Sequence, residues 1–109
     1  MQQSTVERDI DVVAVAVQEL VDAEFEKAGS VIGGSALDQA GLSNGLQLIR
    51  EYLQYGEAGL ALDHLLYMVR ELDLTISADS HAALTRAARA MKVRPEAFDS
   101  VKVAGRLTV

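Results

Sequence analysis

The sequence predicts an all-α fold, with residues 1–109 forming a single domain: a compact bundle of four main helices plus a short carboxy-terminal helix. Three observations predict this fold. Apolar residues recur every three or four positions over several long segments, which is the period of an amphipathic helix. Half of the 109 residues are hydrophobic, and only one is proline. Glycines at positions 29 and 56 follow two of the periodic segments, where helices commonly end.

The most evenly apolar helical pattern covers residues 55–72. Its apolar residues lie on one wide helical face: Ala58, Ala61, Leu62, Leu65, Leu66, Val69 and Leu72. One neighbouring helix cannot cover so wide a face. We therefore expect this helix to be central, with the other helices packed around it.

A first helix is predicted over residues 5–28, with Ser4 or Thr5 as its cap and Gly29 as its stop. The expected core side is apolar: Val6, Ile10, Val13, Val17, Leu20 and Phe25. The opposite side is polar and mostly acidic: Glu7, Asp11, Gln18, Asp22 and Glu26. This stripe is either a solvated outer face or a surface for a partner.

Residues 29–42 contain four glycines but match no phosphate-binding pattern, so we interpret them as a connector with at most a helical turn at 35–39. Ser43 should cap a second helix that ends at Tyr55, where Gly56 permits a sharp reversal. Its inward residues are Leu46, Ile49, Tyr52 and Leu53. Glu57 is expected to accept hydrogen bonds from the first turn of the next helix.

Leu74 and Ile76 should enter the core from a short linker, and Ser77 should cap a fourth helix over residues 78–91. The expected inward residues of that helix are His81 or Ala82, Leu84, Ala87, Ala88 and Met91. Its alanines would allow close approach to the central helix. A final short helix should run from residue 95 to 101 or 102, anchored by Phe98 and Val101, with residues 103–109 extended or frayed.

The net charge is −6, and its distribution is uneven. Eleven of the sixteen acidic side chains but three of the ten basic ones lie in residues 1–63, which gives −8 there and +2 in the remainder. A negative field repels nucleic acid and anionic membranes and attracts a basic partner.

The absence of cysteine excludes disulfides and thiolate metal sites and is compatible with a cytoplasmic location. The longest apolar run, residues 12–17, is far shorter than the ~20 residues that cross a bilayer.

The residues offer no catalytic centre, so we expect no enzyme, no cofactor and no metal. His64 and His81 are not at the spacing of two metal ligands on a helix, and no HExxH motif is present. Asp9 and Asp11 diverge on a helix and make a poor carboxylate pair. The triplet Asp99-Ser100-Val101 superficially resembles the attachment site of acyl carriers, but only eight residues follow it, so we reject that interpretation.

Two sets of residues could bind a partner. A basic cluster could bind DNA, although the net acidity of the chain argues against it: Arg86, Arg89, Lys92, Arg94 and Lys102. Three tyrosines lie near Glu51, Glu57 and Asp63 and could form a contact patch or instead pad the core: Tyr52, Tyr55 and Tyr67. The predicted partner-binding residues are Glu7, Asp11, Asp22, Glu26, Glu51, Tyr52, Tyr55, Asp63 and Tyr67.

Residues 46–91 resemble small bacterial immunity proteins of the MafI-like and related contact-dependent growth inhibition families. The matching residues are Leu48, Ile49, Gly56, Glu57, Ala61, Leu62, Leu65, Glu71, Ile76 and Ser77. The resemblance implies a small helical inhibitor that binds and blocks a cognate toxin domain, often a nuclease, in the producing cell. A nuclease needs a basic cleft to bind phosphate, so the acidic first half of the chain fits a basic partner of this kind. We expect the chain to be a monomer or homodimer. The alternatives are a homo-oligomeric helical scaffold, paired through the first helix, and a small helical regulator that binds nucleic acid.

Overall fold

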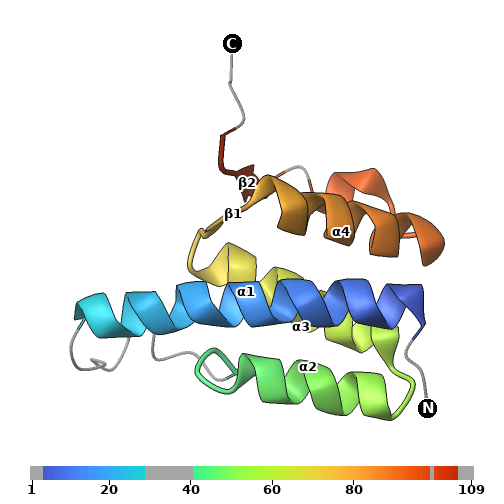
Figure 1. The fold of residues 1–109 in the computed structure, drawn as a ribbon, viewed down its shortest axis with the longest axis horizontal. Helices are drawn as coiled ribbons and strands as arrows, with labels where there is room; N and C mark the ends of the chain where they lie inside the picture. Colours follow the sequence, from blue (N-terminus) through green and yellow to red (C-terminus); the bar gives the residue numbers. More distant parts are fainter. Residues whose placement is uncertain (1–3, 29–40, 99, 106–109) are drawn as a thin grey trace.

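The computed structural model describes residues 4–28, 41–98 and 100–105, and the predicted connector and the end of the tail lie largely outside them. The described residues form an all-α bundle, which confirms the predicted fold class (Figure 1). Its helices are α1 (Thr5–Ala28), α2 (Gly45–Gln54), α3 (Ala58–Glu71), α4 (Ala78–Ala90) and the 3-10 helix η2 (Pro95–Phe98). Two short strands complete it: β1 (Thr75–Ile76) and β2 (Lys102–Val103).

The helix at the centre of the bundle is α1, so the prediction that residues 55–72 form the central helix is wrong. α1 packs against α2, α3 and α4, whereas α3 packs mainly on α1 and α2. α4 lies on the opposite side of α1 from α2 (Figure 1). The alanines of α4 therefore permit close approach to α1 rather than to α3. The 24 residues of α1 give it the length and the wide buried face that three neighbours require.

The core is formed by apolar side chains of all four helices and of the β1 segment. Its largest fully buried side chains are Ile10, Val13, Val17, Val21, Leu42, Ile49, Leu62, Leu65, Met68, Val69, Ile76 and Leu84. Leu74 and Ile76 are buried as predicted. On α4 the buried side includes Ser80 and Ala83, whereas Ala82 is exposed and His81 and Met91 are only partly buried. The buried face of α4 is thus rotated from the predicted one, because it points toward α1.

Helix starts follow the predicted chemistry in α1 and α4 but not in α2 and α3. Ser4 and Glu7 form a reciprocal capping box, and the Ser77 hydroxyl accepts the Ser80 N–H at 3.0 Å. The cap residue of α2 is Asn44 rather than Ser43. Glu57 occupies the cap position of α3, yet its carboxylate makes no capping hydrogen bond in the described structure, because short side chains suit that position and glutamate is long.

The three helices α2, α3 and α4 all end in the same hydrogen-bonded turn, with one residue in the left-handed region. Gly56 has φ +75°, which confirms the predicted reversal, while Asp73 has φ 49° and Lys92 has φ 60°. The closing hydrogen bonds run from Glu57 N to Tyr52 O, from Leu74 N to Val69 O and from Val93 N to Ala88 O. Glycine adopts this conformation at little cost, so a lysine at such a position is energetically unfavourable.

The carboxy-terminal helix is shorter than predicted. η2 ends at Phe98, and β2 then pairs in parallel with β1, so that Thr75 is opposite Lys102 and Ile76 opposite Val103. Pairing requires an extended backbone at residues 102 and 103, which excludes a helix that reaches them. Val101 is buried and Phe98 is partly buried, so both predicted anchors contact the core.

Candidate functional site

The predicted acidic stripe of α1 is not one surface. Glu7 and Glu26 are nineteen residues apart, which separates them by roughly 28 Å along the helix. Glu7 is engaged in the cap of α1, and Asp11 accepts hydrogen bonds from Arg50 of α2 at 2.8 and 3.3 Å. Two members of the stripe therefore serve the fold, and Glu26 lies on a separate part of the helix.

Gln18 was predicted to lie on the polar outer side, and this prediction is wrong: its side chain is buried. The Gln18 amide nitrogen donates to the carbonyl oxygens of Leu42 and Ser43 at 3.1 and 3.3 Å and to Asp22 at 3.0 Å. Its oxygen accepts the Leu46 N–H at 2.9 Å. Gln18 thus joins α1 to the start of α2. This role could not be predicted from the apolar spacing of α1, because that spacing does not show where α2 packs.

Two ion pairs connect α1 to its neighbours on opposite sides. The hydrogen bond from Arg50 to Asp11 raises the pKa of Arg50 above its usual value, and the bond to Asp9 does the same for the pKa of Arg86. Asp9 is nearly buried and pairs with Arg86 at 3.1 Å. This pair holds the carboxyl-terminal half of α4 against the first turns of α1, and Figure 1 shows that the two helices run in opposite directions.

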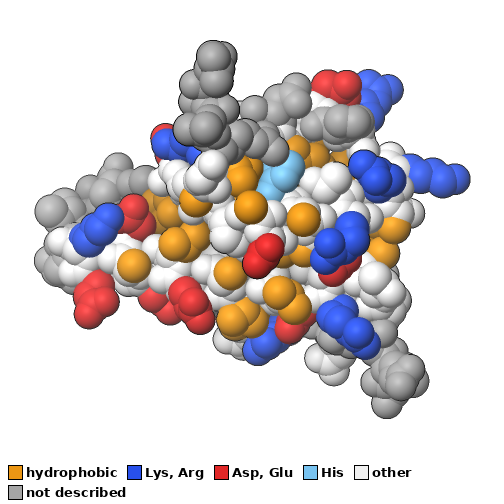
Figure 2. All heavy atoms as spheres, turned by 45° about the horizontal axis from the view of Figure 1, so that its top comes forward, with side chains coloured by type: hydrophobic (Ala, Val, Ile, Leu, Met, Phe, Trp, Pro, Cys, Tyr) orange, Lys and Arg blue, Asp and Glu red, His pale blue; other side chains and the backbone are white. Residues whose placement is uncertain are grey.

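The antiparallel arrangement separates the charges of α1 and α4. Figure 2 shows acidic side chains toward one end of the visible face and basic side chains toward the other. The acidic end is the last part of α1, with Glu19, Asp22, Glu24 and Glu26. The basic end is the last part of α4 and the turn after it, with Arg86, Arg89, Lys92 and Arg94. The charge asymmetry of the sequence is therefore also an asymmetry in space.

The three tyrosines have different environments. Tyr52 packs partly against the core, and the ring of Tyr67 lies 5.4 Å from the ring of His64. Tyr55 is 76% exposed. The structure thus singles out Tyr55 as the tyrosine most available to a partner, while Tyr52 and Tyr67 also support the fold.

Five exposed side chains lie on the last turn of α2, at the turn that follows it and on the first turns of α3. We call this set the turn patch and define it as Glu51, Tyr55, Glu57, Leu60 and Asp63. All five side chains are exposed, and Leu60 is 48% exposed although it is a large hydrophobic residue. Helical spacing makes neighbours of Glu51 and Tyr55, of Glu57 and Leu60, and of Leu60 and Asp63. The patch combines two exposed apolar side chains with three carboxylates.

The backbone of the turn patch is open to solvent and firmly held. A Cβ atom added at Gly56 or Gly59 would meet no described atom within 4 Å. Backbone hydrogen bonds close the turn, from Gly56 N to Leu53 O at 3.1 Å and from Glu57 N to Tyr52 O at 2.8 Å. A rigid surface loses little conformational entropy on binding.

Sequence reasoning identified Glu51, Tyr55 and Asp63 of this patch but missed Leu60. The available signal was its position: Leu60 is a large apolar residue outside the three-and-four spacing of the buried residues of α3. Glu57 was interpreted as a cap. Because its carboxylate makes no capping bond in the described structure, that charge is available at the surface.

The two histidines lie on different helices, His64 on α3 and His81 on α4. His64 Nε2 lies 2.9 Å from the carbonyl oxygen of Gly41, and His81 is partly buried on α4. Across the described ranges, no group of three His, Cys, Asp or Glu side chains is placed to hold a metal ion. No helix in those ranges is both long enough and apolar enough to cross a membrane.

The five residues of the basic cluster have different environments in the structure. Arg86 pairs with Asp9, and Lys102 pairs with Asp73 at 2.8 Å. Arg89, Lys92 and Arg94 remain and line a pocket beside η2.

Comparison of the chain with models of protein families, with curated proteins and with solved structures found no match.

Proposed function

We propose that this chain is a toxin-neutralising immunity protein that binds a basic protein partner through the turn patch and covers the partner's active site. The observation that carries the proposal is the exposure of Tyr55 and Leu60 beside three carboxylates. Tyrosine is enriched among residues that dominate binding energy, because it buries a large area at a small entropic cost. The surrounding acidic side chains would select a positively charged partner and speed its association.

A nuclease is the preferred partner because its substrate is a polyanion. An enzyme that cuts nucleic acid must present a basic cleft to the phosphates. The turn patch could enter such a cleft as a rigid acidic projection. The family resemblance points to the same class of partner.

The residues that carry the resemblance mainly build the helical frame. Ile49, Ala61, Leu62 and Leu65 are buried, and Ser77 caps α4. They support a shared helical architecture, whereas the choice of toxin would depend on surface residues outside this set. Tyr55, Leu60 and Asp63 are such residues, which makes the turn patch the appropriate target for mutation.

The test is to co-express the chain with the carboxy-terminal domain of a large secreted protein encoded beside its gene and to count surviving cells. We expect the wild-type chain to protect them. Tyr55→Ala and Gly59→Arg should each weaken binding of the purified toxin domain by more than about tenfold, because they remove the anchor or place bulk and positive charge on the patch. Calorimetry would measure the affinity.

Ala82→Arg is the matched control, because it adds the same side chain at an exposed position of α4. It should protect cells like the wild type. Glu26→Lys tests the acidic end of α1 as an alternative binding surface. A failure of the wild-type chain to protect would contradict the function, and loss of affinity in Glu26→Lys alone would contradict the proposed surface.

The burial of α1 favours the toxin-binding proposal over the alternative of a homo-oligomer paired through the first helix. Pairing of two copies through α1 would use its apolar stripe, yet Ile10, Val13 and Val17 are fully buried in the core of the same chain. Val12 is the large hydrophobic residue that α1 leaves mostly exposed in the described structure. One such residue does not form a helix-pairing stripe.

A further inference from the structure

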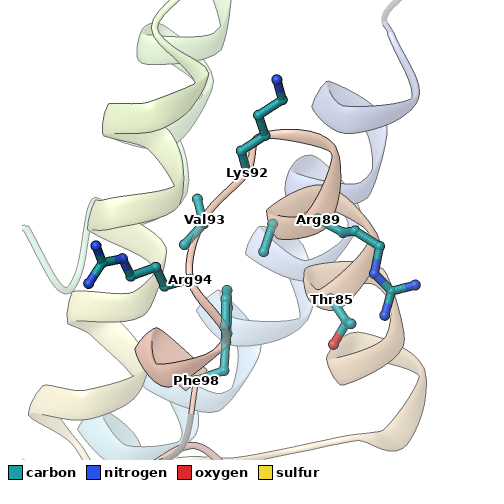
Figure 3. A pocket seen from close by; sticks show the side chains of 7 residues that line it. Thr85, Arg89, Lys92, Val93, Arg94 and Phe98 are labelled. Atoms are coloured by element: carbon teal, nitrogen blue, oxygen red, sulfur yellow. The ribbon is translucent and has the colours of Figure 1, made fainter.

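A pocket of about 460 Å³ lies between the end of α4 and η2, and none of its lining residues belongs to the turn patch. Its interior is lined by carbon-rich side chains: Ala88, Val93 and Phe98, with Thr85 on the α4 wall. Figure 3 shows Val93 and Phe98 together on the segment that faces α4. The volume falls within the range of about 300–1,000 Å³ typical of small-molecule sites.

The walls of the pocket are held by hydrogen bonds. The Val93 N–H donates to the Ala88 carbonyl at 2.8 Å, and the Ala97 N–H donates to the Arg94 carbonyl at 3.1 Å. Arg70 of α3 donates to the carbonyl oxygen of Ala97 and thereby fastens η2 to the bundle. The pocket is therefore formed before any ligand arrives.

Three cationic side chains surround this apolar interior. Arg89, Lys92 and Arg94 contribute to the pocket lining, and Figure 3 shows their charged ends directed away from the hollow and away from one another. Within the part of the chain that the structure describes, none of the three makes a side-chain hydrogen bond or ion pair. In contrast, Arg86 is neutralised by Asp9. The rim thus presents uncompensated positive charge above a carbon-lined hollow.

Lys92 adds a second reason to connect the rim with binding. Its φ of 60° places it in the left-handed region at the helix end, where glycine would be more stable. Positive charge near the end of α4 does interact favourably with the helix dipole. The dipole does not account for the apolar hollow that Lys92 borders, whereas a ligand with a charged head and an apolar body would use both features.

We propose that this pocket binds a small free carboxylate with an apolar chain. The chain would lie against Val93 and Phe98, and the carboxylate would lie at the rim, where the flexible side chain of Lys92 can turn to pair with it. A nucleic acid is disfavoured as the ligand, because its hydrated phosphates would leave the carbon-lined interior unfilled. The inference does not depend on the toxin-binding function, since the turn patch contributes no residue to this pocket.

Octanoate is the probe for the test, added to the full chain in an NMR titration. We expect saturable shifts for residues of α4 and η2. Acetate has the charge without the chain, and octanol has the chain without the charge, so each should bind at least about tenfold more weakly. Vesicles of phosphatidylglycerol should not sediment the protein, because the proposed ligand is a free molecule. Equal binding of acetate or octanol, or vesicle binding in place of octanoate binding, would overturn the proposal.

Two variants test the pocket itself. Thr85→Leu should fill it and reduce octanoate affinity at least tenfold while the protein stays folded. Lys92→Gly should bind octanoate several-fold more weakly yet melt at a higher temperature, because glycine suits the left-handed turn. Lys27→Gln removes one positive charge from the end of α1 and should leave binding unchanged, as should Tyr55→Ala. Unchanged affinity in both pocket variants would refute the site.

Discussion

The two ends of α2 differ in how far their side chains are buried and their polar groups are hydrogen-bonded within the protein. At the start of the helix, Leu42 is fully buried, Gly45 lies against Met68, and the buried Gln18 side chain bonds the adjacent backbone. At the other end, Tyr55 is 76% exposed. There the Glu57 carboxylate makes no capping bond in the described structure.

This difference shows that stability and binding make opposite demands on a surface. A buried polar group must be paired, because an unpaired one costs about 1–3 kcal/mol. A binding surface must instead keep polar and aromatic groups available until the partner arrives. The start of α2 meets the first demand through Gln18, and the turn patch at its end meets the second. We call the start of α2, with Leu42, Gly45 and Leu46, the closed end, and the turn patch with Gly56 and Gly59 the open end.

Gln18→Ala tests the closed end and should have the largest effect on stability. It removes the side-chain partner of the partly buried Leu46 N–H and of the buried Leu42 carbonyl. We expect the free energy of unfolding to fall by about 2–4 kcal/mol. Urea denaturation followed by circular dichroism would measure it.

Asp22→Asn is the control for this change, since it alters one exposed partner of Gln18 but keeps the amide in place. It should change stability by less than about 0.5 kcal/mol. If Gln18→Ala were equally mild, water would be replacing the side chain, and the closed end would not depend on Gln18.

Gly45→Ala should also weaken the closed end, although helix propensity alone favours alanine. A Cβ at Gly45 would lie 2.3 Å from the sulfur and the methyl carbon of Met68. Met68 is fully buried, so its side chain has little room to move. We expect a loss of about 1–3 kcal/mol in the free energy of unfolding, measured in urea.

A second substitution separates this clash from other causes. Met68→Ala in the Gly45→Ala background provides room, so the Gly45→Ala substitution should cost less there than in the wild type. Additive losses would show that the contact with Met68 is not responsible.

Gly59→Ala, at the open end, should raise the stability of the protein instead of lowering it, and its effect should be the smallest of the three. Gly59 lies in the first turns of α3, and an added Cβ meets no described atom within 4 Å. Alanine should raise the free energy of unfolding by about 0.5–1 kcal/mol, because it lowers the entropy of the unfolded chain. A thermal melt of the purified variant would measure the gain, and a loss would mean that the turn is more crowded than its geometry indicates.

Features encoded by neighbouring residues could be predicted from the sequence. The bounds of α1 follow from its apolar period and its capping residues. The cap at Ser77 and the reversal at Gly56 depend on side chains within a few positions. For the site, the exposed Tyr55 was among the predicted residues, because tyrosine is enriched at binding surfaces and Glu51 and Glu57 lie near it in the sequence.

Features that depend on distant parts of the chain could not be predicted in this way. The central position of α1, the burial of Gln18 and the shortening of the last helix all follow from which elements meet in space. The pocket at the end of α4 also needs η2 to be fastened by Arg70. Periodicity shows that a helix has an apolar face but does not identify its neighbours.

By itself, therefore, the sequence determined the fold class, the span of the first helix and the places where helices turn, because hydrogen bonds and apolar spacing within each helix are local. The tertiary structure decided which helix is central, which polar side chain is buried, and which tyrosine and cations remain available. Those outcomes depend on contacts between residues far apart in the chain. Periodicity alone does not decide which helix faces meet each other, and packing makes that choice.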